Sequence, residues 1–115
     1  MHFSRRRYKK GKSPPAQMNV KFHPDATIEL IEAAHFYEER QEGLGDRLLD
    51  AVEEAIAFIR MHPTIWRSDE KGRRKYRAKR FPYLIIYKIK NDSLYILAIA
   101  HTSRKPGYWK MRDEP

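Results

Sequence analysis

The chain has 115 residues, enough for one domain with a modest core, and carries 24 lysines and arginines against 15 acids, a net charge of +9. It has no cysteine, which excludes disulfides, thiolate catalysis and cysteine-ligated zinc. Its apolar runs are far shorter than the roughly 20 residues that span a bilayer. We therefore expect a cytoplasmic protein without a membrane segment.

The charge is unevenly distributed along the chain. Residues 1–17 hold six basic residues and no acid, residues 25–62 hold ten acids and three bases, and residues 63–115 hold fourteen bases and five acids. The folded part is therefore expected to have an acidic half and a basic half. A basic surface attracts nucleic-acid phosphates or an acidic protein segment, and charge alone does not choose between them.

The first 17 residues, MHFSRRRYKKGKSPPAQ, have almost no apolar content. Such a segment cannot form a core, and we expect it to be disordered or extended. It is either a basic arm that binds phosphates or a non-native extension upstream of a functional start at Met18, and we favour the second interpretation. The folded domain is expected over residues 18–115.

A short strand is predicted to begin at Met18, where Val20 and Phe22 alternate with polar residues. Pro24 suits the first turn of a helix. Apolar residues then recur at three- and four-residue steps and predict one amphipathic helix, with this stripe: Ala26, Leu30, Ala33, Ala34 and Tyr37.

Gly43 and Gly45 end the first helix, and a second helix with one apolar face runs over residues 48–59 until His62-Pro63 stops it. Two helices with so short a break form an antiparallel hairpin. The acidic residues of the two helices are expected on the solvated side: Glu32, Glu38, Glu39, Asp46, Asp50, Glu53 and Glu54.

Three strands are predicted in the second half of the chain. A basic strand over residues 73–79 is expected to place Tyr76 and Ala78 on the face opposite to Lys75, Arg77 and Lys79. After a turn at Phe81-Pro82, residues 83–89 and 94–101 form two apolar strands joined by a hairpin. The predicted fold class is α+β: an N-terminal strand, an antiparallel helix hairpin, and a three-stranded antiparallel meander with one face covered.

Motifs for metals and cofactors are not found in the sequence. The five histidines are scattered, and no HExxH, glycine-rich phosphate loop or GxSxG occurs. We therefore predict no metal site and no cofactor.

The basic strands and the segment after them carry the residue types that metal-free RNA cleavage needs. Arginines can stabilise the phosphorane charge, a histidine or tyrosine can transfer protons, and aromatic rings can stack on bases. The candidate catalytic residues are Arg80, His101, Arg104 and Tyr108. The candidate residues for binding nucleic acid or a partner protein are Arg73, Arg74, Lys75, Arg77, Lys79 and Trp109.

Each of these candidates also has a structural interpretation. Arg77 and Lys79 fit an ordinary exposed strand face, and a histidine at a strand end, such as His101, more often makes a local hydrogen bond. Tyr108 and Trp109 fit aromatic packing over the sheet edge.

An ordered set of short segments between Met18 and Arg112 resembles the RelE/ParE toxin superfamily, and within it the plasmid stabilisation proteins. The segments are Phe22-His23-Pro24-Asp25-Ala26, Glu32-Ala33-Ala34 with Phe36-Tyr37, Gly43-Leu44-Gly45, His62-Pro63, Arg80-Phe81-Pro82-Tyr83, and Ala98-Ile99-Ala100-His101 with Arg104, Pro106, Tyr108 and Trp109. The resemblance implies a helix hairpin on a small sheet. It also implies a growth-arresting toxin of a type II toxin–antitoxin pair, neutralised by a small acidic antitoxin.

Members of the superfamily differ in their cellular target. RelE-like members are ribosome-dependent mRNA endonucleases, whereas ParE-like members poison DNA gyrase. The nuclease branch carries an arginine in the strand after the Pro-Tyr turn, and this chain has Leu84 there. We therefore favour a ParE-like or undetermined target. The alternatives are a RelE-like nuclease and a degenerate toxin that keeps only antitoxin binding and operon autoregulation. A homodimer and a hetero-oligomer with the antitoxin both stay open.

Overall fold

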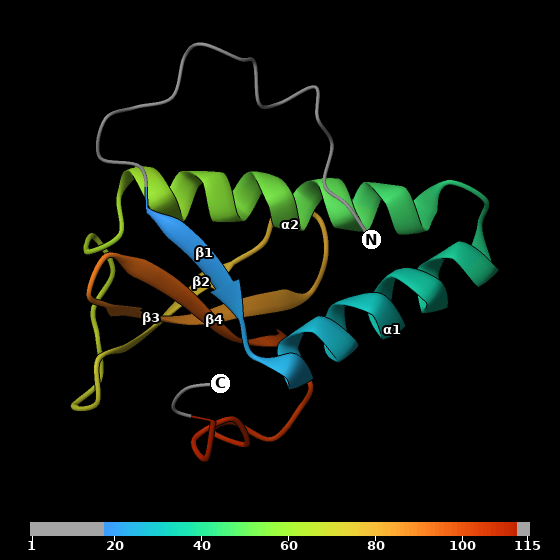
Figure 1. Cartoon of the computed structure of the whole chain (residues 1–115). Helices are drawn as coiled ribbons and strands as arrows, with labels where there is room; N and C mark the ends of the chain where they lie inside the picture. The colour runs from blue at the N-terminus through green and yellow to red at the C-terminus, as the bar shows by residue number, and fades with distance from the viewer. Residues whose placement is uncertain (1–17, 113–115) are drawn as a thin grey trace, which may run out of the picture.

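The computed structural model describes residues 18–112, so the predictions for residues 1–17 lie outside the described part of the chain. Its elements are β1 (Asn19–Phe22), α1 (Pro24–Arg40), α2 (Leu44–Met61), β2 (Arg73–Arg77), β3 (Tyr83–Lys90) and β4 (Ser93–His101) (Figure 1). The predicted α+β fold, with a helix hairpin between the first strand and a meander, is confirmed.

The four strands form one sheet in the order β1-β4-β3-β2. The pairs β2–β3 and β3–β4 are antiparallel, as the meander required. β1 pairs with β4 in parallel, from Asn19 opposite Ser93 to Phe22 opposite Ile96. Because β1 ends at Phe22, it covers only the first half of the β4 edge.

Both helices pack on one face of the sheet and enclose the main core. Its members have little exposed surface and come from every layer: Leu30 of α1, Leu48, Val52 and Ile59 of α2, and Ile85, Tyr87, Leu94, Ile96 and Ile99 of the sheet. The apolar stripes predicted for both helices therefore face the strands. Tyr87 is fully buried, and its hydroxyl donates to the carbonyl of Pro63 at 3.1 Å, which holds the start of the connector after α2 against β3.

The corner between the helices depends on two glycines and one carboxylate. Gly43 has a φ of 88°, a backbone conformation that residues other than glycine rarely adopt. The Glu38 carboxylate accepts from the amides of Gly43 and Gly45, both at 2.9 Å. These two hydrogen bonds lower the pKa of Glu38.

The prediction that all the helix acids are solvated is wrong for one of them. Glu53 retains only 2% of its surface in contact with solvent. It lies on α2 between Val52 and Glu54, at the border of the buried stripe, where the helical period alone does not decide burial.

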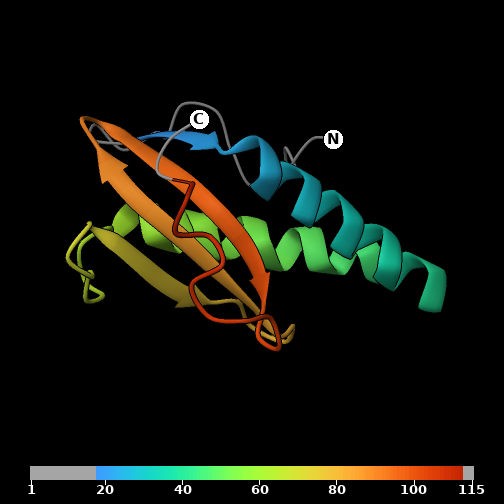
Figure 2. The same cartoon turned by 90° about the horizontal axis from the view of Figure 1, so that it is seen from below.

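The second face of the sheet, which points away from the helices, carries a smaller apolar cluster formed by Ile86, Leu97, Ala98, Ala100 and Trp109. The segment after β4 crosses this face, as the red trace in Figure 2 shows. Trp109 on that segment is buried against the strands. The second face is therefore partly covered by the chain itself.

The basic strand ends earlier than predicted. β2 stops at Arg77, and the chain turns at Arg80, which has φ of 71°. The amide of Ala78 still bonds the carbonyl of Tyr83 at 2.9 Å, so the turn stays attached to β3. Because of this turn, Lys79 and Arg80 do not continue the alternation of the strand.

Candidate functional site

Two exposed basic residues of β2 lie on the second face. Lys75 pairs with Ile86, and Arg77 pairs with Leu84. Ile86 belongs to the second-face cluster and Leu84 packs against it. Because directly opposed residues in an antiparallel pair point to the same side, Lys75 and Arg77 flank this cluster, and both are exposed.

Arg73 and Arg74 make structural contacts instead. Arg73 is 8% exposed; its Nε donates to Asp69 Oδ2 at 2.8 Å, and its Nη1 to the Lys110 carbonyl at 3.2 Å. Arg74 Nε donates to the Trp66 carbonyl at 2.7 Å. The two arginines therefore hold the connector and the C-terminal segment against β2.

Asp69 is the acidic partner of Arg73. Partial burial by itself would raise the pKa of Asp69, but hydrogen bonds from the Arg73 side chain and from the Arg73 and Lys71 amides lower it to about 2. The Asp69 carboxylate is therefore ionised at neutral pH, and its negative charge offsets the positive charge of Arg73.

Lys79 and Arg80 lie on the helix side of the sheet rather than with Lys75. Lys79 lines a small hollow with Phe58 and Tyr76. Arg80 lines a neighbouring hollow with residues of α2, among them Arg47 and Asp50. The predicted common face for Lys75, Arg77 and Lys79 is thus wrong for Lys79, because the strand ends before it.

A cavity of about 520 Å³ opens on the second face, between the connector before β2, β2 itself and the C-terminal segment. Trp66, Ile86 and Trp109 supply apolar walls, and Lys75 and Lys110 are among the basic residues that line it. The Lys75 ammonium lies 5.5 Å from the centre of the Trp109 ring. We call this space the tryptophan cavity.

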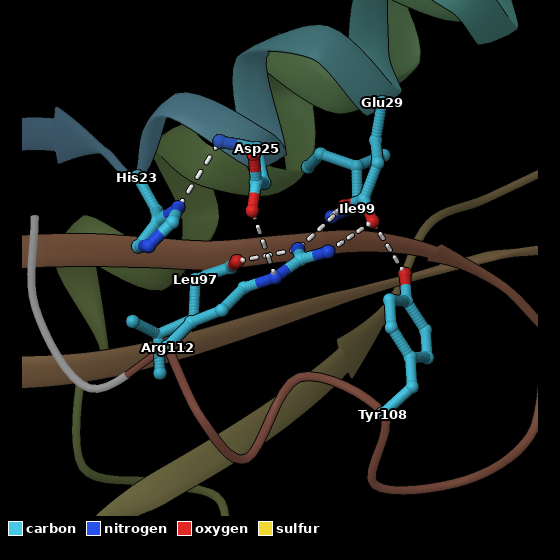
Figure 3. A network of polar contacts seen from close by, with 7 residues as sticks. All are labelled: His23, Asp25, Glu29, Leu97, Ile99, Tyr108 and Arg112. Carbon is cyan, nitrogen blue, oxygen red and sulfur yellow. Dashed lines mark hydrogen bonds and ion pairs between the residues drawn. The ribbon is translucent and has the colours of Figure 1, made fainter.

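A polar network fastens the C-terminal segment to α1 and to the edge of β4 (Figure 3). Glu29 accepts from the Tyr108 hydroxyl at 2.8 Å, from Arg112 Nη2 at 2.9 Å and from the Ile99 amide at 2.9 Å. Arg112 Nη1 also donates to the Leu97 carbonyl at 3.1 Å. The side chains of Glu29 and Arg112 therefore bond the Ile99 amide and the Leu97 carbonyl, which lie on the part of the β4 edge that β1 does not reach.

Tyr108 and Arg104 are brought together by this segment. The Arg104 guanidinium lies 3.9 Å from the centre of the Tyr108 ring. Burial raises the pKa of Tyr108, and the hydrogen bond to Glu29 raises it further. A phenol in this state holds its proton at neutral pH and is a weak candidate for a general base.

His101 lies at the end of β4, with its ring 5.1 Å from that of Tyr83. Its Nδ1 is 3.0 Å from the Ser103 amide, which donates to it, and 2.8 Å from the Ser103 hydroxyl. This local contact is the structural interpretation expected for a histidine at a strand end.

The four candidate catalytic residues therefore occupy three surroundings. Arg104 contacts Tyr108, His101 contacts Ser103 and Tyr83, and Arg80 lines a hollow on the helix side.

Several residues of this region were missed from the sequence. Glu29 and Arg112 are 83 positions apart, so no periodicity could connect them. Trp66 carried a weak signal, since it is a large aromatic in an otherwise polar connector. Within residues 18–112 no group of three or more histidines and acids is arranged to hold a metal ion. No helix in that range is long and apolar enough to cross a membrane.

Comparisons with known proteins agree with this architecture. The chain is similar in fold to a solved structure described as the chromosomal ParDE toxin–antitoxin system from P. aeruginosa, with a TM-score of 0.66 and 17% identity over 76% of this chain and 99% of the other. No curated protein sequence matches the chain. The family profile of the ParE toxin of the type II toxin–antitoxin system parDE matches residues 20–106. This chain therefore belongs to the ParE toxin family of type II toxin–antitoxin systems.

Proposed function

We propose that the chain is a growth-arresting toxin whose target is ParE-like, namely DNA gyrase, and that a cognate acidic antitoxin neutralises it. Membership of the ParE toxin family supports the role of toxin, and the second face of the sheet supports the choice of target.

Leucine at position 84 is the feature that most favours gyrase over RNA as the target. It occupies the strand position where the nuclease branch of the superfamily has an arginine, and it packs beside the apolar cluster of the second face. An apolar side chain cannot offset the charge that develops on a cleaved phosphate. This favours a gyrase poison over an RNA endonuclease.

The surroundings of the other candidates favour the same choice. The Tyr108 hydroxyl is engaged by Glu29, and His101 Nδ1 is engaged by Ser103. Metal-free RNA cleavage needs a base, an acid and a phosphate-binding cation placed around the phosphate that is cleaved. No contact between described residues joins Arg80 to His101 or to Arg104.

Antitoxin binding is supported by charge and by exposed apolar surface. Lys75 and Arg77 project from β2 as exposed cations. Large apolar side chains are also exposed on the helices: Ile28, Ile31, Phe36, Phe58 and Met61. The two features lie on opposite sides of the sheet, so one apolar segment of an acidic partner would cover the helices and another, acidic segment would pair with the cations of the second face.

The test is induced expression of the chain alone and together with the small acidic protein encoded beside it. Expression alone should arrest growth and produce gyrase-linked DNA breaks, the purified chain should inhibit supercoiling by gyrase, and co-expression should restore growth. Cuts within translated codons, mapped by primer extension, would instead establish the nuclease. Unchanged growth with tight antitoxin binding would establish a degenerate toxin.

A further inference from the structure

We propose that the outer side of α2 is the interface of a homodimer, in which two copies of this chain pack α2 against α2 in antiparallel orientation about a two-fold axis. This goes beyond the proposed function, because neither gyrase poisoning nor antitoxin binding requires the toxin to self-associate. The exposed Ile28 and Ile31 belong to α1 and lie outside this interface, so they stay available to the antitoxin.

α2 carries a second stripe beside the one that faces the core. The core stripe contains Leu48, Val52 and Ile59. The second stripe repeats at alternating steps of three and four residues, which is the spacing of a coiled-coil interface. We call this second stripe the α2 seam: Leu44, Arg47, Ala51, Glu54, Phe58 and Met61. A stripe at this spacing follows one side of a helix, so a second helix can pack against its whole length.

The shape of the α2 seam is complementary to itself. Near its start a hollow of about 400 Å³ opens beside Leu44 and Arg47, and the short, largely buried side chain of Ala51 is among its lining residues. At the other end Phe58 and Met61 are 41% and 69% exposed. One helix therefore carries both a recess and the apolar side chains that can fill a recess, at opposite ends.

An antiparallel pair of helices brings these opposite ends together. The register that matches recess to apolar end places Leu44 opposite Met61 of the second copy. Arg47 then lies opposite Phe58, because both pairs of positions are centred on the same point of the helix. Methionine is a flexible side chain that fills irregular spaces, and a guanidinium is attracted to the exposed face of an aromatic ring. Each contact forms twice, as a two-fold axis requires.

The charges of the α2 seam are also complementary to themselves. In this register Glu54 lies about one helical turn from Arg47 of the second copy, within reach of its long side chain. Both residues are exposed, and within residues 18–112 neither has an ion-pair partner. The hollow at the start of the seam is lined by two arginines and two acids: Arg47, Arg80, Asp50 and Glu54. This surface is therefore locally neutral in a chain of net charge +9.

A second copy fits this surface better than an acidic segment does. The carboxylates of an acidic segment would lie beside Asp50 and Glu54, where like charges repel. A second copy instead supplies one Arg47 to each Glu54. Because the surface is locally neutral, two basic molecules can approach each other there without strong repulsion.

The size of the interface predicts weak, reversible association. α2 has 18 residues and is therefore roughly 27 Å long. A single helix pair of this length is a small interface, and small interfaces belong to transient complexes. Analytical ultracentrifugation of the full chain between about 1 μM and 1 mM should show a monomer–dimer equilibrium. No larger species should form, because an interface of this symmetry closes on itself.

An exchange of charges tests the location and the antiparallel register. Arg47→Glu brings two carboxylates together at each contact, and Glu54→Arg brings two guanidiniums together, so each variant should dimerise about tenfold or more weakly. An equal mixture of the two variants should form a heterodimer at least about fivefold tighter than either variant with itself, because opposite charges again meet at both contacts.

The matched control is Glu32→Arg on α1, which changes the net charge as much as Glu54→Arg does. It lies outside the α2 seam and should dimerise within about twofold of the original chain. Circular dichroism verifies that all variants are folded.

The proposal is overturned by any of four results. The original chain stays monomeric at every concentration, the control variant loses as much affinity as the seam variants, or the mixture dimerises no more tightly than its components. The fourth result is unchanged self-association of Arg47→Glu and Glu54→Arg together with a loss of antitoxin binding, which would assign the α2 seam to the antitoxin.

Discussion

Glu29 is the residue that connects most parts of the molecule. Its carboxylate accepts hydrogen bonds from Ile99 on β4 and from Tyr108 and Arg112 on the C-terminal segment. The side chains of Glu29 and Arg112 are only 14% and 15% exposed. Removing one partner of a largely buried ion pair with several hydrogen bonds is strongly destabilising, because the remaining charged and polar groups lose their partner.

We predict that Glu29→Ala lowers the free energy of unfolding by about 2–3 kcal/mol, since it leaves a guanidinium, a phenol and a backbone amide without their acceptor. Urea unfolding followed by circular dichroism measures this change. Glu32→Ala, on the exposed side of the same helix, should stay within about 0.5 kcal/mol of the original chain. Equal effects of the two substitutions would contradict a structural role for Glu29.

The raised pKa values of three tyrosines predict that the folded chain loses stability at high pH. Burial raises the pKa of Tyr83 and of Tyr87 to about 12, and burial together with the Glu29 hydrogen bond raises that of Tyr108. The unfolded chain releases these protons near its ordinary value of 10.0, whereas the folded chain retains them. Stability should therefore be complete below pH 10 and fall as the pH rises above it.

Tyr108→Phe checks the contribution of one of these tyrosines. In that variant the alkaline slope of the unfolding free energy should be shallower by about 1.4 kcal/mol per pH unit. The hydrogen bond to Glu29 is lost as well, which lowers stability at every pH but does not change the slope. Urea unfolding at several values above pH 10 measures the slope, and an unchanged slope would be evidence against a raised pKa for Tyr108.

At the level of elements, the corner between α1 and α2 sets how closely the helices approach. A Cβ added to Gly45 would lie 2.5 Å from the backbone carbonyl of Ala34, and that carbonyl belongs to the opposite helix. Glu38 binds the amides on the far side of the corner. The sequence indicated a helix break here, and the structure adds that Gly45 serves helix contact rather than the turn itself.

We predict that Gly45→Ala destabilises the chain by about 1–3 kcal/mol through overpacking. The direction is informative, because alanine in a helix is otherwise favoured over glycine by about 1 kcal/mol. Ala57→Gly, at an exposed position of α2, measures that intrinsic preference in the same protein. A Gly45→Ala variant as stable as the original chain would mean that the helices are not in contact at this point.

At the level of the whole molecule, the basic second half of the chain is divided between two surfaces. Lys75 and Arg77 lie on the second face of the sheet, whereas Lys79 lines a hollow beside α2. Long-range charge governs association rates between oppositely charged proteins, and salt screens it. The two surfaces can therefore be separated by reversing charge on one at a time.

Lys75→Glu combined with Arg77→Glu should slow association with the cognate antitoxin about tenfold or more at low salt and make the rate less dependent on salt. The control, Lys21→Glu with Lys79→Glu, changes the net charge equally and should retain most of the rate. Stopped-flow measurements at two ionic strengths compare them. Equal slowing in both pairs would show that only net charge matters and would exclude the second face as the docking surface.

The elements and the family were predictable because their signals are local. Apolar stripes at helical spacing, the Gly43–Gly45 break and the apolar strands after Phe81 each depend on neighbouring residues, and each prediction is confirmed by the fold. The ordered segments that resembled the RelE/ParE superfamily agree with the family match over residues 20–106. The sequence by itself therefore determined the α+β class, the order of the elements and the family.

Only the tertiary structure decided which distant residues meet. β1 pairs in parallel with β4, with Val20 and Phe22 packed against the main core, and its end at Phe22 leaves free the backbone groups of β4 that Glu29 and Arg112 bond. The end of β2 at Arg77 turns Lys79 toward α2, and the C-terminal segment folds back to form the tryptophan cavity. These contacts join residues far apart in the chain, and packing selects them, so no local pattern in the sequence carries them.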